Sequence, residues 1–267
     1  MGSTQARSPG ASPARVCAAF AALSGLVGCA PELTVGRWTC AENGVETEIP
    51  EKTAPIAVPW STGFEDRFCG YTQLAGFCYT EDLASYSIVS SPVHEGRHAA
   101  AFRVISGTEG HQTRCVRQGQ LPSDAYYGVW FLVPQTATND AVWNLVHFQG
   151  GTPEGQHGLW DISLVNGSNG QLEAVVYDFL NGAVYRPATP VPIPINAWFH
   201  LEFHLKRAAD ASGEVALYQD GQRLVEETNL VTDDTSWGQW YVGNFATGLT
   251  PPDFTLYVDD VTIRVTR

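Results

Sequence analysis

Basic residues are scarce in this chain. Lys and Arg together number 15 against 28 Asp and Glu, which gives a formal net charge of −13 at pH 7. A protein this acidic is repelled by nucleic acid and by anionic lipid headgroups, so we expect neither as a partner. The apolar segment near the N-terminus, residues 16–27, is too short to cross a bilayer as a permanent helix.

Helical periodicity is also lacking, and short alternating runs take its place. The clearest is residues 198–206, where four apolar residues alternate with four polar ones after Trp198. Turn signals such as Asp220-Gly221 separate several of the runs. The chain predicts an all-β fold, a two-sheet antiparallel sandwich. Its expected strands are residues 86–89, 99–104, 126–133, 142–149, 160–165, 172–179, 198–206, 214–219, 240–244 and 254–265.

The N-terminal segment has the order of a secretory signal. Arg7 and Arg15 precede the apolar run, which ends in Leu26-Val27-Gly28-Cys29. This tetrapeptide resembles the lipobox of bacterial lipoproteins, which implies removal of residues 1–28 and lipidation of Cys29. Ala30 follows, not Asp, so the expected location is the outer membrane or cell surface, with the membrane contacted through the lipid alone. An ordinary secretory peptide remains the alternative.

Four cysteines remain if Cys17 leaves with the signal and Cys29 carries lipid. An even number in an oxidising compartment predicts two disulfides, with three possible connectivities. Cys69 and Cys78 are close in sequence, so we favour that pair, which leaves Cys40 to pair with Cys115.

Two motifs carry a resemblance to a fold family. They are NAWFHLE at residues 196–202 and GEVALYQDGQ at residues 213–222. With GFE at 63–65, VHEGRHA at 93–99 and LYVDDV at 256–261, they resemble concanavalin A-like jelly rolls, including carbohydrate-binding modules and heparin-lyase-type polysaccharide lyases. The resemblance covers residues 61–267 and implies a jelly-roll domain there. Residues 29–60, rich in Pro, Glu and Thr, are expected to form a tether from the anchor.

The lyase resemblance implies a catalytic set. Some jelly-roll lyases carry a Gln-x-His pair on a strand that lines the groove, and here the order is reversed in His147-Phe148-Gln149. Alternation places His147 and Gln149 on one face, which we expect them to share with Trp143. Eliminating a uronate needs a carboxylate neutraliser, a base and an acid. Arg117, His147, Gln149 and Tyr185 are the predicted catalytic residues, and we expect them to converge.

A second group of residues is predicted to bind glycan. Sugar rings present apolar faces that stack on aromatic side chains, and arginines bind uronate carboxylates. The candidates are Arg114, Trp143, Tyr177, Arg186, Trp237 and Trp240, of which Trp237 and Trp240 are expected to be the most exposed.

The resemblance also implies a structural Ca²⁺. In modules with this opening and ending, an acidic residue of the first strand and one of the last often hold calcium, which here are Glu65 and Asp260. The alternative for Glu65 is an ion pair with Arg97. No organic cofactor is expected, and the protein is expected to be a monomer. His200, Glu202 and His204 share a strand face but are too widely spaced for one zinc ion, so we expect a solvated outer sheet there.

Three functions remain open at this stage. The first is binding of an extracellular polysaccharide on the concave face of the jelly roll without cleavage. The alternative is a polysaccharide lyase that cleaves a uronate-containing glycan by β-elimination. The third is a non-catalytic structural or adhesion protein of the cell envelope.

Overall fold

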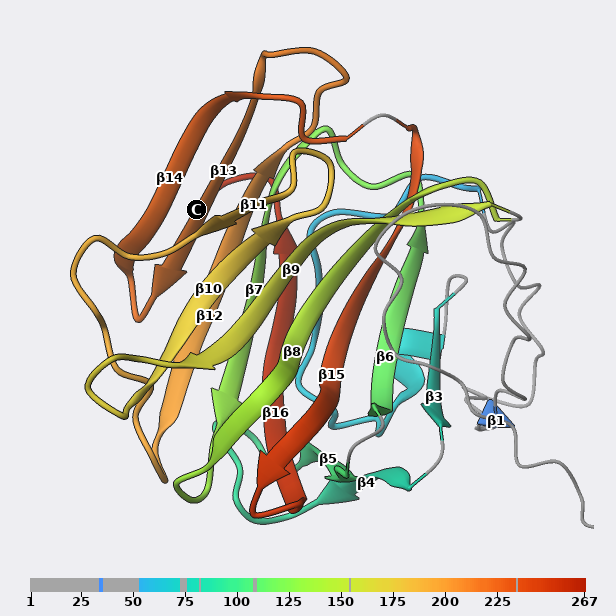
Figure 1. Ribbon diagram of the computed structural model, residues 1–267. Coiled ribbons are helices and arrows are strands. Elements are labelled where there is room, and N and C mark those ends of the chain that lie inside the picture. The colour runs from blue at the N-terminus through green and yellow to red at the C-terminus, as the bar shows by residue number, and fades with distance from the viewer. Residues whose placement is uncertain are drawn as a thin grey trace, which may run out of the picture.

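Two antiparallel sheets pack face to face in a computed structural model of the chain (Figure 1). It describes residues 34–35, 53–72, 76–81, 83–107, 110–153, 155–233 and 235–267. The first sheet has the strand order β1-β3-β6-β15-β8-β9-β10-β11, and the second has β14-β13-β12-β7-β16-β5-β4, with β2 paired to β16. This arrangement confirms the predicted two-sheet jelly-roll sandwich.

The strands account for most of the described chain. The first sheet consists of β1 (Thr34–Val35), β3 (Phe77–Glu81), β6 (His111–Gly119), β15 (Trp237–Thr250), β8 (Thr138–Gly151), β9 (Gln156–Asn166), β10 (Leu172–Asp178) and β11 (Ala183–Tyr185). The second consists of β14 (Gln222–Leu230), β13 (Gly213–Gln219), β12 (Trp198–Lys206), β7 (Asp124–Leu132), β16 (Asp253–Arg264), β5 (Ala99–Ile105) and β4 (Ala84–Val89), with β2 (Trp60–Thr62) alongside β16. One short helix, α1 (Cys69–Thr72), precedes β3.

Alternating apolar side chains build the core between the sheets. In β12, Phe199, Leu201 and Phe203 are buried against the first sheet's inner residues, as the period of two predicts. Every predicted strand overlaps an observed one. The Asp220-Gly221 turn joins β13 to β14, and both residues have positive φ.

Two of the longer strands, β6 and β14, were not predicted. β6 reads HQTRCVRQG and carries polar residues toward both faces, so its sequence does not alternate. It is a strand because β3 and β15 pair along its two edges. Tertiary pairing therefore decides this element against its local pattern.

The disulfide pairing differs from the predicted one. Cys78 on β3 and Cys115 on β6 are direct cross-strand partners and form a disulfide on the inner face of the first sheet. Both favoured pairs, Cys69–Cys78 and Cys40–Cys115, are therefore wrong. Closeness in sequence misled the prediction, because strand register places Cys78 beside a residue 37 positions away. Cys69 is disulfide-bonded as well, and Cys40 lies outside the described residues.

The N-terminal predictions fall largely outside the described part of the chain. This applies to the signal at residues 1–28 and to Cys29. Within the predicted tether, the Ile56 amide donates to the carbonyl of Gln120, and Trp60 begins β2. None of the helices in the described residues is long and apolar enough to cross a membrane.

Candidate active site

One row of side chains crosses the outer face of the first sheet at right angles to its strands. Direct cross-strand partners project from the same face of a sheet. Following these pairs from β3 to β11 gives one continuous row: Phe77, Val116, Tyr241, His147, Asp161, Tyr177 and Val184. Phe77 and Val116 pack with Tyr79 and Tyr241 in a small cluster apart from the main core. We call this set the central row.

Glutamines form a second row beside the central one. Gln118, Gln239 and Gln149 are direct partners across β6, β15 and β8. The Gln239 amide donates to the Gln118 carbonyl oxygen at 3.0 Å, and the Tyr241 hydroxyl lies 2.7 Å from Oε1 of Gln149. This glutamine row places uncharged hydrogen-bonding groups next to Tyr241 and His147. Amides in such a position are suited to binding carboxylate and hydroxyl groups of a sugar.

His147 and Asp161 form a pair at the centre of the row. The Nδ1 atom of His147 lies 2.5 Å from Oδ1 of Asp161, and the two side chains are 14% and 15% exposed. A carboxylate at Nδ1 fixes the ring orientation and holds the proton on Nδ1, which leaves Nε2 as the basic nitrogen. The ring also faces Tyr241, with 5.3 Å between the two ring centroids. His147 is therefore oriented to accept a proton.

Tyr241 has the properties of a proton donor. It is nearly fully buried, and burial raises its pKa well above the ordinary value of 10, with the nearby Tyr79 acting in the same direction. The phenol therefore stays protonated at neutral pH. Its hydroxyl contacts the amides of Gln149 and Gln239, so the O–H group is held at the junction of the central and glutamine rows.

Arg114 places a positive charge behind the tyrosine. Its guanidinium lies 5.7 Å from the Tyr241 ring centroid and 4.9 Å from that of Phe245, and it donates to Asn144 at 2.7 Å. The space for it comes from Gly243, its cross-strand partner, which has φ +155 and where a Cβ would lie 2.7 Å from the Cα of Arg114. A cation held here stabilises negative charge that develops on a bound substrate.

Tyr79 on β3 lies beside the central row, as the direct cross-strand partner of Arg114. Its hydroxyl donates to Oε1 of Gln112 at 3.0 Å, and burial raises its pKa to about 12. Its ring packs edge-on against Tyr241, with centroids 6.4 Å apart.

The predicted catalytic residues do not converge. His147 and Gln149 lie on the outer face as expected, whereas Arg117 points to the inner one, where it stacks over Trp60 and donates to the carbonyl of Tyr71. Burial lowers the pKa of Arg117 to about 10. Tyr185 also lies on the inner face, because its partner Val176 belongs to the core. The four-residue set is therefore wrong as a unit, since strand alternation separates Arg117 and Tyr185 from His147.

The three predicted glycan-binding tryptophans are buried, two of them in the core between the sheets. Trp240 is fully buried in the core against Tyr127 and Phe148, and Trp237 is only 4% exposed, so the expectation that these two tryptophans are exposed is wrong. Trp143 belongs to the core, because a bulge between Asn144 and Val146 shifts the alternation, so it does not share the face of His147.

The other predicted glycan-binding residues lie at or beside the outer face. Arg114 and Tyr177 project from it, and Arg186 is exposed just beyond β11.

The predicted calcium ligands have protein partners. Oε1 of Glu65 accepts hydrogen bonds from the backbone amides of Arg97 and His98, and Oδ2 of Asp260 lies 2.6 Å from Nδ1 of His94. In the described part of the chain, no group of three His, Cys, Asp or Glu side chains is arranged to hold a metal ion. The alternative for Glu65 is confirmed, because Nε of Arg97 lies 3.5 Å from Oε2 of Glu65. The calcium ion stays a prediction.

Sequence reasoning missed three residues of the site. Tyr241, Asp161 and Gln239 are not among the residues predicted from the sequence. The alternation of Gln239 and Tyr241 with Trp240 and Val242 would have placed the first two on one face. The Asp161 contact carried no such signal, because it depends on the register between β8 and β9, which contains two irregularities.

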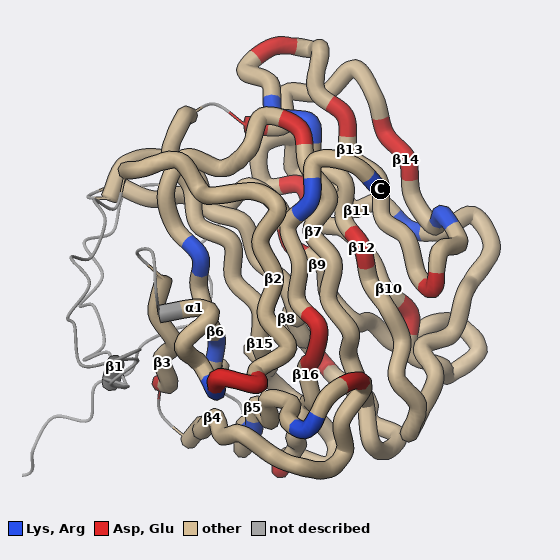
Figure 2. The backbone as a smooth tube through the Cα atoms, turned by 180° about the vertical axis from the view of Figure 1, so that it is seen from behind, with Lys and Arg blue, Asp and Glu red and all other residues tan. Residues whose placement is uncertain are grey.

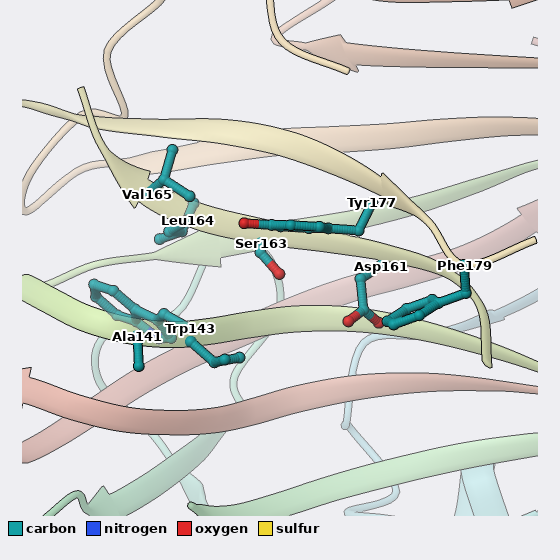
Figure 3. Close-up of a pocket in the computed structure, with 9 residues that line it drawn as sticks. Ala141, Trp143, Asp161, Ser163, Leu164, Val165, Tyr177 and Phe179 are labelled. Atoms are coloured by element: carbon teal, nitrogen blue, oxygen red, sulfur yellow. The ribbon is translucent and has the colours of Figure 1, made fainter. Parts of the chain in front are cut away.

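A pocket adjoins the row at β9 and β10 (Figure 3). It has a volume of about 190 Å³. Figure 3 shows Tyr177 extending over Ser163, with Asp161 and Phe179 at one end of its ring. The residues that line the pocket are Ala141, Val142, Trp143, Asp161, Ser163, Leu164, Val165, Tyr177 and Phe179. The outer face therefore carries polar side chains on β6, β15 and β8 and a largely apolar hollow at β9 and β10.

Comparisons with solved structures agree with this architecture. An endo-β-1,4-glucuronan lyase from the fungus Trichoderma reesei superposes with a TM-score of 0.55 and 22% identity, over 70% of this chain and 90% of that one. A cellulose-induced protein, Cip1, gives a TM-score of 0.54 and 17% identity, over 78% and 97%. A marine PL-14 alginate lyase from Aplysia kurodai gives 0.52 and 10%, over 76% and 97%. At these identities the likeness establishes the fold.

The family is established by sequence. No curated protein matches the chain. The family model described as polysaccharide lyase, however, matches residues 65–262, which include the whole outer-face site. This match covers most of the chain, and the chain therefore belongs to the polysaccharide lyase family.

Proposed function

We propose that this protein is a polysaccharide lyase that cleaves a uronate-containing glycan by β-elimination across the central row. The observation that carries the proposal is the alignment of Tyr241, His147 and Asp161 on three neighbouring strands, beside the glutamine row. Family membership and the similarity in fold to the glucuronan lyase and the alginate lyase support cleavage over binding alone.

The proposed reaction uses one base and one acid. The Nε2 atom of His147 takes the proton from C5 of the uronate, because Asp161 holds the other ring nitrogen. The electron pair of the C5–H bond forms the C4=C5 double bond as the C4–O4 bond breaks. The Tyr241 hydroxyl gives its proton to the leaving O4. The products are an unsaturated uronate and a new hydroxyl end, and the proton returns from His147 to Tyr241 through solvent.

Neutralising the uronate carboxylate makes the C5 proton more acidic. The carbonyl oxygens of Gln149 and Gln239 both accept from the Tyr241 hydroxyl. In the proposed reaction, an N–H of each of these side-chain amides donates to the uronate carboxylate. Arg114, behind the Tyr241 ring, adds positive charge without occupying the surface of the groove. The same groups would stabilise the enediolate that forms when the proton leaves.

The test is an elimination assay on the purified protein. Soluble protein is incubated with polyglucuronate, alginate and a neutral glucan, and near-ultraviolet absorbance is followed, because only an unsaturated uronate absorbs there. We expect absorbance with at least one uronate polymer and none with the glucan. Tyr241→Phe should lower kcat by about 10²- to 10³-fold through loss of the acid. Tyr126→Phe, on the outer face of the other sheet, is the matched control. Retention of uronate polymers without absorbance would favour binding alone.

We further propose that the enzyme acts outside the cytoplasm, tethered by lipid at Cys29. The support is the signal-like order of residues 1–28 and the lipobox-like Leu26-Val27-Gly28-Cys29. Expression of the full chain in a bacterium with labelled fatty acid should label the protein, and Cys29→Ser should abolish the label. Labelling that persists in that variant would overturn the anchor.

A further inference from the structure

The pocket at β9 and β10 differs in charge from the rest of the outer face. Its lining is largely apolar, and Asp161 is the one charged residue in it. Arg114, by contrast, lies on β6, three strands away from β9. A uronate in the pocket would therefore face an aspartate with no cation among the lining residues.

Apolar side chains around the pocket reach solvent. Val142 on its rim is 39% exposed and Phe179 is 52% exposed, although both are large hydrophobic residues. Val184, the last residue of the central row, is exposed as well. Exposed apolar residues gathered around a hollow mark a binding surface. Tyr177 adds a flat ring to it, as Figure 3 shows.

The position of the pocket fixes which part of the substrate reaches it. The central row runs from His147 on β8 to Tyr177 on β10, two strand spacings or about 10 Å away, the length of about two sugar units. A polysaccharide that lies along the row with its reacting uronate at Tyr241 and His147 therefore places the second unit from the reacting one in the pocket.

We propose that this pocket is a subsite for an uncharged sugar unit, so that the natural substrate is a heteropolymer in which a neutral sugar lies near the cleaved uronate. The C–H face of the neutral ring stacks on Tyr177 and contacts Phe179 and Val142, while Asp161 disfavours a carboxylate at that position. This inference rests on the proposed function, because it assigns the pocket to the same substrate chain.

Defined oligosaccharides test the proposal. The probes are a β-1,4-linked glucuronate tetrasaccharide and two isomers in which one end unit is glucose. We expect one glucose-ended isomer to be cleaved with at least a fivefold higher kcat/KM than the all-uronate probe. Val142→Lys, which places a cation on the pocket rim, should bring that ratio to about one. Val265→Lys adds the same charge at an exposed valine beyond β16 and should leave the ratio unchanged.

Calorimetric binding of the same three probes separates this inference from the proposed function. If the all-uronate probe is cleaved as well as both isomers, or the ratio does not change in Val142→Lys, the subsite is wrong and the lyase stands. If no probe is cleaved but a glucose-ended isomer binds more tightly, with the preference lost in Val142→Lys, the lyase fails and the subsite stands. Equal binding of all three, or none, overturns the subsite.

Discussion

Histidine–aspartate pairs lie on the outer faces of both sheets, and they differ in their surroundings. On the first sheet, His147 and Asp161 are both largely buried, 2.5 Å apart, and the ring faces Tyr241. On the second sheet, His204 lies 2.7 Å from Asp124, which is 53% exposed, and its ring is stacked flat on Tyr126. Figure 2 views the molecule from behind and shows acidic and basic residues intermixed there.

A histidine–aspartate pair does not by itself form a reactive site. On the second sheet, charges are paired with opposite charges: Glu202 accepts from Arg264 and Arg267, and Lys206 donates to Glu214. On the first sheet, the side-chain amides of Gln149 and Gln239 contact the Tyr241 hydroxyl, and Asp161 contacts Nδ1 of His147, so these contacts orient the groups that move protons.

The largest effect on kcat is expected at His147, and a much smaller one at His204. His147→Gln should lower kcat on a uronate polymer by about 10³-fold, because it removes the base while keeping a polar side chain. His204→Gln should change kcat by less than about twofold. The measurement is the initial rate of absorbance increase, with circular dichroism to confirm folding. Equal losses of kcat in both variants would show that His147 is no more important for catalysis than His204.

A smaller effect is expected from the glutamine row. Gln149→Ala should lower kcat/KM by about tenfold, because one carboxylate donor is lost while Gln239 remains. Steady-state kinetics on the same polymer provides the measurement. An unchanged kcat/KM would show that the uronate carboxylate of the substrate binds elsewhere on the sheet.

On the second sheet, changing a charge should affect stability and leave catalysis intact. Glu202 is buried beneath two arginines that are each 41% exposed. Glu202→Gln should therefore cost about 1–2 kcal/mol in the free energy of unfolding, less than a fully buried pair, with kcat unchanged. Urea unfolding and the lyase assay check the two parts. A fall in kcat in a folded Glu202→Gln variant would show that the charges of the second sheet also affect catalysis.

The smallest effect concerns pH, at Asp259 on the second sheet. Burial raises the pKa of this carboxyl from 3.8 to about 6, against hydrogen bonds from the amides of His94 and Asp260. The folded state therefore binds the proton more tightly than the unfolded state, so this group lowers stability as pH rises from about 4 to about 6. Asp259→Asn lacks this titration, so the difference in melting temperature between wild type and variant should change as the pH rises from about 4 to about 6. A wild-type and variant difference that does not vary with pH would contradict this.

The sequence predicted the fold better than the site. Alternation in β12 and the Asp-Gly turn were readable because each depends on neighbouring residues alone. The pairing of His147 with Asp161 depends on the register of two strands with bulges, and Arg117 appeared to be a groove residue because its strand has polar residues on both faces. Trp237 and Trp240 were misassigned because nearness to Gly238 does not reveal whether an aromatic side chain is exposed.

The sequence by itself determined the sandwich, its acidic character and the candidate pair His147 and Gln149. The sandwich and the acidic character follow from composition and from the period of two along single strands. The pair His147 and Gln149 follows from the resemblance to jelly-roll lyases. Only the tertiary structure decided that Cys78 joins Cys115, that Tyr241 faces His147, and that Arg117 and Tyr185 point away. The physical reason is that hydrogen bonding between strands fixes the register, and register determines which distant residues meet on one face.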